Sequence, residues 1–246
     1  MNLDLLSMSL VSISAFVVVV VIADTLGSNH RERITIGVLL GLWFASVCAI
    51  GASRLIAGGG PLAAGGLGVL VIVPLVILSL AAFLSRRRLE RIQQVKMLPL
   101  ISVQILRMLG VIFVLLFAAH RLPAPFAPSA GYGDILTGLL AIPLTWAIAT
   151  RHKWPRVGIW LWSALGMGDL ITAITLGALS APGPLQVFRS APSSSIMPTL
   201  PWILIPGFLV PCFFFLHLVV LAKMRIQEAD PSHQVAKADA IEASSI

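Results

Sequence analysis

The feature that most constrains this chain is a series of seven apolar segments, each long enough to cross a lipid bilayer. At about 1.5 Å per residue, a helix needs about 20 residues to cross a hydrocarbon core of about 30 Å. A strand or coil exposed to lipid would leave backbone groups unpaired, so each segment is expected to be helical. The segments cover residues 5–26, 34–53, 67–85, 98–120, 132–150, 157–179 and 201–222.

The composition agrees with this prediction. Of the 246 residues, 58% are hydrophobic and 11% are charged, whereas soluble domains average about 45–50% apolar and about 25% charged residues. An ordinary soluble enzyme, a secreted disulfide scaffold and a disordered chain are therefore excluded. We predict an all-α membrane protein with one seven-helix transmembrane domain over residues 1–226 and a short, polar, disordered tail over residues 227–246. The first segment is expected to be a retained span, since Asp4 stands where a signal peptide carries basic residues.

The basic residues predict the orientation of the spans. Seven alternating helices place most of the 17 Lys and Arg residues on one side: Arg31, Arg33, Arg86, Arg87, Arg88, Arg91, Lys96, Arg151, Lys153, Arg156, Lys223, Arg225 and Lys237. Only Arg54, Arg121 and Arg189 fall on the opposite side. The positive-inside rule then places the N-terminus outside and the C-terminus in the cytoplasm. These residues lack interleaved aromatic side chains, so the net charge of +7 does not indicate nucleic acid as a partner.

Five polar residues inside the apolar segments stand out, since ionisable and strongly polar groups are costly there and usually mark functional positions. They are Gln104 and Arg107 in the fourth span, Asp134 at the start of the fifth, Asp169 in the sixth and His217 in the seventh. Arg107 and Asp169 are expected within about 5 Å of the same depth, so we predict that they pair. Gln104 lies one turn from Arg107, close to the depth of His217. The sequence thus predicts a polar cluster among spans four to seven, with a role in binding or in structure.

Two further patterns predict how helices pack. Gly37, Gly41 and Ala45 form a stripe of small residues on the second span. Such a stripe permits close approach, and packing inside the bundle is favoured over homodimerisation. Pro201, Pro206 and Pro211 recur along the seventh span, which should therefore be the most irregular helix.

The segment Ser129–Asp134 has the sequence SAGYGD and is similar to the selectivity filter of potassium channels. A filter needs an extended loop that presents rings of carbonyls, and a pore helix before it. The preceding residues 121–128 are too short and too rich in proline for a pore helix. The favoured interpretation is a turn with Asp134 near the start of the fifth span.

Residues 131–134 and 166–169 both read GxGD, the motif of presenilin-like and prepilin-peptidase intramembrane aspartyl proteases. Two carboxyl groups that share a proton can activate water if they lie a few ångströms apart. Asp134 is expected near the outer end of its span and Asp169 near the membrane midplane, which disfavours that geometry. Arg107 would also hold Asp169 ionised. A protease that uses Asp134 and Asp169 is therefore a minor alternative.

Cofactor and metal sites have no support in the sequence. Cys48 and Cys212 form no CxxC pair, so neither a zinc site nor a disulfide framework is indicated. His120 and His217 should differ in depth by roughly 25 Å and cannot ligate one haem iron together. A retinal protein needs a lysine in the middle of its last span, and Lys223 lies at the cytoplasmic edge. We therefore expect no cofactor and no metal.

From Gln104 onward the chain resembles an uncharacterised family of bacterial multispan membrane proteins. The residues that carry this resemblance, over about residues 104–217, are Gln104, Arg107, Gly110, Leu122-Pro123, Phe126-Ala127, Ala130–Asp134, Gly168–Leu170, Ile205-Pro206, Val210-Pro211 and His217. The family often has proline where this chain has Ser129. The resemblance implies a bacterial inner-membrane location and supports the choice of polar residues, and it implies no chemistry.

The leading functional hypothesis is a carrier of a small molecule or ion, or a ligand-sensing membrane protein. Transport by such a carrier could be coupled to the movement of protons. The alternatives are a non-catalytic accessory or assembly subunit of a membrane complex, in which the polar cluster is structural, and the aspartyl protease. A role other than catalysis is favoured. The expected partners are the lipid bilayer, a small-molecule or ion ligand, and a larger membrane complex.

Overall fold

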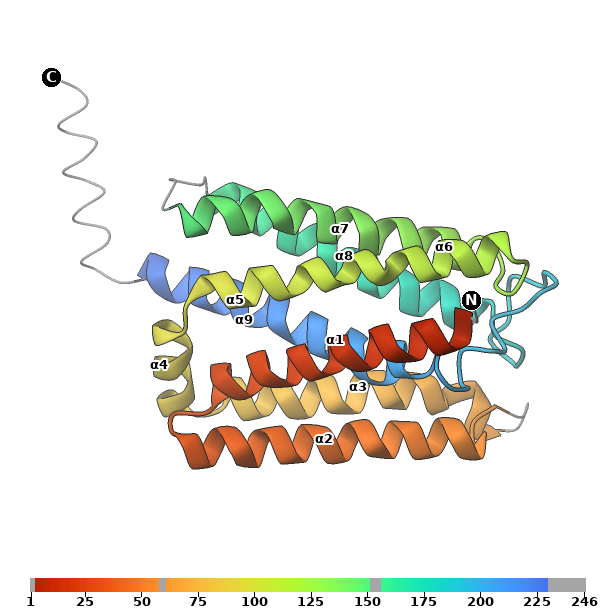
Figure 1. Cartoon of the computed structure of the whole chain (residues 1–246), viewed down its shortest axis with the longest axis horizontal. Coiled ribbons are helices and arrows are strands. Elements are labelled where there is room, and N and C mark those ends of the chain that lie inside the picture. The colour runs from red at the N-terminus through yellow and green to blue at the C-terminus, as the bar shows by residue number, and fades with distance from the viewer. Residues whose placement is uncertain (1–2, 58–60, 151–155, 230–246) are drawn as a thin grey trace, which may run out of the picture.

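The computed structural model describes residues 3–57, 61–150 and 156–229, and the regular elements of these residues are all helical. Seven of its helical spans are long and apolar enough to cross a membrane, which confirms the predicted multi-pass, all-α architecture. The spans lie alongside one another and alternate in direction (Figure 1). Five are single helices: α1 (Leu3–Leu26), α2 (His30–Ser53), α3 (Pro61–Phe83), α7 (Phe126–Ala149) and α8 (Arg156–Leu179).

The other two spans change their helical geometry along their length. The fourth begins as α5 (Met97–Ser102), tightens into the 3₁₀ helix η1 (Val103–Gly110) and continues as α6 (Val111–Ala118). The seventh begins with a π-helical turn, η2 (Ile205–Leu209), and continues as α9 (Val210–Ala229). Proline removes a backbone donor and crowds the preceding turn, so Pro206 and Pro211 account for the wide turn. The irregularity expected of the seventh span is therefore present.

Helix α7 begins at Phe126, six residues before the predicted start of the fifth span at residue 132. Pro128 falls in its first turn, where a backbone N–H would have no partner within the helix and its absence costs nothing. The proline-rich segment therefore contains the start of a helix, although its sequence resembles a loop. As a result, Asp134 lies in the third turn of α7, and its predicted place at the helix start is wrong.

A short helix, α4 (Arg86–Gln94), lies across one end of the bundle (Figure 1), in the connection between the predicted third and fourth spans. Its Ile92 side chain is fully buried. The ammonium group of Lys223, near the end of α9, donates to the backbone carbonyls of Ile92 and Gln93. The last carbonyls of a helix lack partners within it and carry partial negative charge, so Lys223 caps α4.

The start of α2, the whole of α4, the start of α8 and the end of α9 lie at this same end of the bundle (Figure 1). The described basic residues of those segments therefore gather there. Arg151, Lys153 and Lys237, which the orientation argument also used, lie outside the described residues. Helix α9 runs three residues past the predicted domain boundary at 226, and the rest of the predicted tail, residues 230–246, also lies outside them.

At the opposite end, the guanidinium of Arg121 joins three parts of the chain. It donates to the Asp4 carboxylate at 2.6 Å and lies over the ring of Trp202 at 5.4 Å from the ring centroid. Asp4 belongs to α1, Arg121 to the connection between α6 and α7, and Trp202 to the segment before η2. A cation over an indole ring and a close carboxylate both stabilise such a junction.

The seventh span is the centre of the bundle. Of its apolar window, 67% is buried inside the protein, against 17% for the window of α2. Phe208 and Phe215 on this span are fully buried. A helix that is apolar all round is expected at the core, and its neighbours then expose their outer faces to lipid.

The small-residue stripe of α2 does not pack inside the bundle. A Cβ atom added at Gly37 or Gly41 would meet nothing within 4 Å, and Ala45 is exposed. The predicted packing role of the stripe is therefore wrong. Helix α2 packs through another face, where Val47 is fully buried and a Cβ at Gly51 would lie 2.6 Å from Ile203. Small residues permit close approach without requiring it.

Candidate functional site

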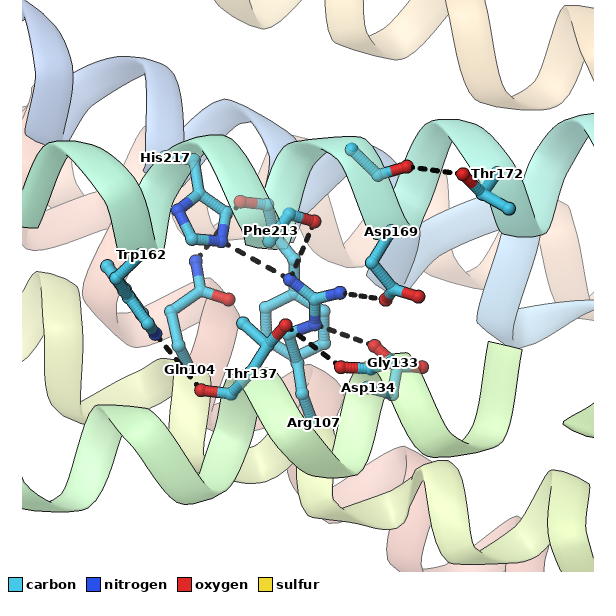
Figure 2. Close-up of polar contacts among 12 residues, drawn as sticks. Gln104, Arg107, Gly133, Asp134, Thr137, Trp162, Asp169, Thr172, Phe213 and His217 are labelled. Carbon is cyan, nitrogen blue, oxygen red and sulfur yellow. Dashed lines mark hydrogen bonds and ion pairs between the residues drawn. The ribbon is translucent and has the colours of Figure 1, made fainter. Parts of the chain in front are cut away.

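Arg107 is the centre of a buried polar cluster in the middle of the fourth span (Figure 2). Its side chain is 0% exposed. The Nε atom donates to Oδ1 of Asp134 at 2.6 Å, and Nη2 donates to Oδ2 of Asp169 at 2.5 Å. The ion pair that the sequence predicted between Arg107 and Asp169 is therefore present, and a second carboxylate shares the same guanidinium. Charge-assisted bonds this short are among the stronger hydrogen bonds in proteins.

The remaining nitrogen of the guanidinium faces two acceptors on other helices. Nη1 donates to the backbone carbonyl of Gly166 at 3.0 Å and lies 3.3 Å from Nε2 of His217. A guanidinium has no lone pair to offer, so Nε2 accepts and the imidazole is neutral with its proton on Nδ1. The ring of His217 also packs on the ring of Trp162, with 4.7 Å between the centroids. All three nitrogens of Arg107 are thus engaged, by groups from α7, α8 and α9.

Gln104 precedes Arg107 by three residues on η1, a spacing that places both side chains on one face of a 3₁₀ helix. Its Nε2 donates to the backbone carbonyl of Phe213 at 3.1 Å. Gln104 and Arg107 therefore both make a polar contact with α9. Oε1 of Gln104 and Nδ1 of His217 are buried and have no hydrogen-bond partner among the described residues. Such atoms are uncommon in native proteins, and each has unused capacity to bind a proton donor or acceptor.

One glycine in each GxGD motif leaves room for a side chain of the cluster. A Cβ atom at Gly133 would lie 1.7 Å from Oδ1 of Asp169, so the second glycine of the first motif leaves room for the carboxylate of the other motif. A Cβ at Gly166 would lie 2.5 Å from Nε2 of His217, and the carbonyl of Gly166 accepts from Arg107. These close approaches require the absence of a side chain.

The structure brings four of the five predicted residues together through Arg107 and places Gln104 beside them. The sequence argument that separated Asp134 from Asp169 in depth is wrong, because both carboxylates bind one guanidinium. The early start of α7 is the reason. Sequence reasoning missed the role of Gly133, Gly166 and the Gly166 carbonyl, although the repeated motif was the available signal.

The SAGYGD segment is helical throughout, within α7, and Tyr132 is 62% exposed on its surface. A filter of extended carbonyls therefore does not form in this chain, and the similarity to potassium channels does not extend to structure.

The charges of the cluster do not balance when both carboxyl groups are ionised. One guanidinium and a neutral imidazole face the carboxylates of Asp134 and Asp169, which leaves one negative charge uncompensated. Such a charge inside a membrane protein is costly unless a proton or a cation neutralises it. The two acids are slightly exposed, whereas the Arg107 side chain is fully buried. The side chain of Asp134 is 16% exposed and that of Asp169 is 9% exposed.

A cavity of about 20 Å³ touches Arg107 and Asp134. A space of about 10–15 Å³ is the minimum for one water molecule, so this cavity is large enough for a water or a small cation. Among the described residues, no group of three or more His, Cys, Asp or Glu side chains is placed to hold a metal ion. The cluster can therefore bind and release one proton or one small cation at its carboxyl groups, beside a guanidinium that stays charged.

The chain belongs to the family described as Domain of unknown function (DUF8737), whose model matches residues 64–225. The match includes all five residues of the predicted cluster and reaches back to α3, well beyond the resemblance from residue 104 that the sequence indicated. Helices α1 and α2 lie outside it. No curated protein and no solved structure matches the chain.

Proposed function

We propose that this protein is a membrane carrier of a small molecule or ion, and that the Arg107 cluster takes up and releases a proton or a small cation during its cycle. The observation that carries the proposal is the sharing of one buried guanidinium by two carboxylates, from α7 and α8. Ionisable groups in this setting commonly form proton relays or substrate sites.

The change of charge has a structural consequence. With one carboxyl protonated the cluster is neutral, and Arg107 binds the remaining carboxylate more tightly. When that proton leaves, both carboxylates compete for the guanidinium. Because Asp134 and Asp169 are on different helices, the protonation state biases how α7 and α8 lie against η1. A ligand that favours one arrangement shifts the population towards it.

The two irregular segments adjoin this cluster. Arg107 lies on η1, and η2 directly precedes α9, which contributes His217. Departures from α-helical geometry in the middle of a span often mark hinges and functional positions. They support a carrier whose fourth and seventh spans bend.

The proposed setting is the cytoplasmic membrane of a bacterium, with the N-terminus outside, the C-terminal tail in the cytoplasm and residues 1–226 as one transmembrane domain. The gathering of basic residues at the end that carries α4 supports this orientation. A small-molecule or ion ligand is the proposed partner besides lipid.

One observation favours a second candidate, the intramembrane aspartyl protease. The two GxGD carboxylates lie close enough to bind the same guanidinium. In such a protease, however, the carboxyl groups share a proton and a water directly. Here Arg107 binds both of them, so the carrier is the better supported function. A protease would lose cleavage completely in both Asp134→Asn and Asp169→Asn.

The test of a carrier is whether water reaches the cluster from both sides of the membrane. Leu109 lines the cavity beside Arg107, and its neighbour Met108 faces outward with 37% exposure. In a protein whose Cys48 and Cys212 are replaced by Ala, we expect Leu109→Cys in liposomes to react with a membrane-impermeant thiol reagent added on either side. The matched control, Met108→Cys, should remain unlabelled because lipid surrounds it.

If the reagent labels Leu109→Cys from neither side of the membrane, the proposal is contradicted. It would favour an accessory or assembly subunit, in which the cluster is dry and structural.

A further inference from the structure

A second, larger pocket lies between α3 and α8, at the end of the bundle opposite α4. Its volume is about 270 Å³. Gly68, Val71, Ala173, Gly177 and Met197 are among the residues that line it. Small residues on both helices make the space, and the lining is almost wholly apolar. Pockets of about 300–1,000 Å³ are typical of small-molecule sites, so this pocket lies just below the lower end of that range.

This apolar pocket is next to the charged cluster. Phe113, Ile205 and Val210 line both the apolar pocket and the small cavity that touches Arg107 and Asp134. Ile205 belongs to the π-helical turn η2, and Pro206 of the same turn also lines the apolar pocket. The two spaces therefore adjoin along these three apolar side chains, one of which lies on an irregular segment.

The two spaces together specify the chemistry of an occupant. The apolar pocket favours a hydrocarbon body, because it offers few polar partners. The cluster favours one positive charge, because one carboxylate is uncompensated. A neutral polar group would not supply the positive charge, and an anion would be repelled by the two acids.

We propose that the apolar pocket binds the body of a lipophilic compound with one ammonium group, and that Asp134 receives the ammonium in exchange for a proton. This inference rests on the proposed function and names its substrate class. Asp134 is the receiving group because it lines the small cavity and is the more exposed of the two acids.

The exchange balances in charge and in protons. The O–H bond of the protonated Asp134 breaks, the proton passes to water, and the carboxylate pairs with the ammonium, which keeps all of its own protons. Asp169 on α8 remains paired with Arg107 on η1, and His217 on α9 remains neutral as the acceptor from Arg107. One bound cation thus replaces one bound proton, and the charge of the cluster does not change.

The experiment uses the intact protein in lipid nanodiscs and three ligands of equal chain length: octylammonium, octanol and octanoate. Binding is measured by calorimetry in two buffers of different ionisation enthalpy, which gives the number of protons released, with empty nanodiscs as the blank. We expect octylammonium to bind at least about tenfold more tightly than octanol, a difference of about 1.4 kcal/mol. We also expect about one proton released per octylammonium bound, and no binding of octanoate.

Two variants locate the site. Ala173→Phe fills the apolar pocket and should weaken octylammonium binding at least about tenfold, whereas Ile171→Phe, at a position 53% exposed to lipid on the same helix, should not. Asp134→Asn should abolish the proton release and the preference over octanol.

Equal binding of octanol and octylammonium to the unmodified protein, or binding without proton release, would overturn this inference whether or not the variants fold. Thiol labelling at Leu109→Cys is independent of these ligands. A carrier that takes another substrate would still be labelled from both sides, so failure of this inference is distinct from failure of the proposed function.

Discussion

At the scale of single residues, Arg107 faces more negative charge than it can neutralise. Its three nitrogens bind two carboxylates, a backbone carbonyl and an imidazole. Removing a buried cation leaves its partners unpaired, which typically costs about 3–5 kcal/mol. The energetic link between Arg107 and each acid is therefore measurable as a coupling free energy.

A double-mutant cycle between Arg107→Ala and Asp169→Ala tests this link. We expect a coupling free energy of about 0.5–3 kcal/mol in the free energy of unfolding, because the two side chains are 2.5 Å apart. Denaturation of the detergent-solubilised protein gives the four values. The control cycle pairs Arg107→Ala with Asp24→Ala, since Asp24 binds Arg33 instead. Full additivity in the first cycle would contradict the geometry of the cluster.

The glycine of the first GxGD motif gives a second prediction. Gly133→Ala places a Cβ atom where the Asp169 carboxylate lies, so it should displace that carboxylate and lower stability by about 1–3 kcal/mol. The matched variant is Gly168→Ala, since a Cβ there meets nothing within 4 Å. Gly168→Ala should leave stability unchanged or raise it by up to about 1 kcal/mol. Equal effects of the two substitutions on the thermal midpoint would contradict this explanation of the motif.

The members of the cluster could be predicted from the sequence, but only one of their contacts could. Depth along a helix follows from counting residues, which is why the pairing of Arg107 with Asp169 was predictable. Asp134 was misplaced because a proline-rich stretch resembles a loop, although proline is tolerated in the first turn of a helix. The space left by Gly133 depends on a contact between two helices, and no local pattern encodes it.

At the scale of elements, η2 was foreseeable and η1 and α4 were not. Proline spacing predicts that the seventh span is irregular, and the wide turn η2 before α9 is that irregularity, whereas no proline lies within η1. Helix α4 is rich in arginine, and its few apolar residues become informative only when α1, α3 and α9 supply a surface for Ile92. Its cap, Lys223, is far away in the sequence.

The cap of α4 gives a third prediction. Lys223→Met should remove the donor for the carbonyls of Ile92 and Gln93, and unbonded buried groups cost about 1–3 kcal/mol. We expect the backbone amides of α4 to exchange hydrogen for deuterium faster, measured by mass spectrometry. The control is Arg225→Met, because Arg225 lies over the Trp160 ring and not at the end of α4. If α4 exchanges at the same rate in all three proteins, Lys223 is not its cap.

At the scale of the whole molecule, the seventh span, made of η2 and α9, is central among the other six, and the polar cluster and the apolar pocket both adjoin it. Hydropathy alone was sufficient to predict seven spans, because each needs a long apolar run in lipid. It could not predict which span is central, since lipid-facing and protein-facing surfaces are both apolar. The small-residue stripe of α2 was misassigned for that reason.

The central claim is that the cluster exchanges a proton, and infrared difference spectroscopy tests it most directly. The protein in nanodiscs is titrated across neutral pH, and the band of a protonated carboxylic acid is followed. We predict a band that disappears as the pH rises and that is lost or shifted in Asp134→Asn and Asp169→Asn, but retained in the control Asp24→Asn. A spectrum with no such band at any pH, or a band unaffected by both substitutions in the cluster, would contradict the account.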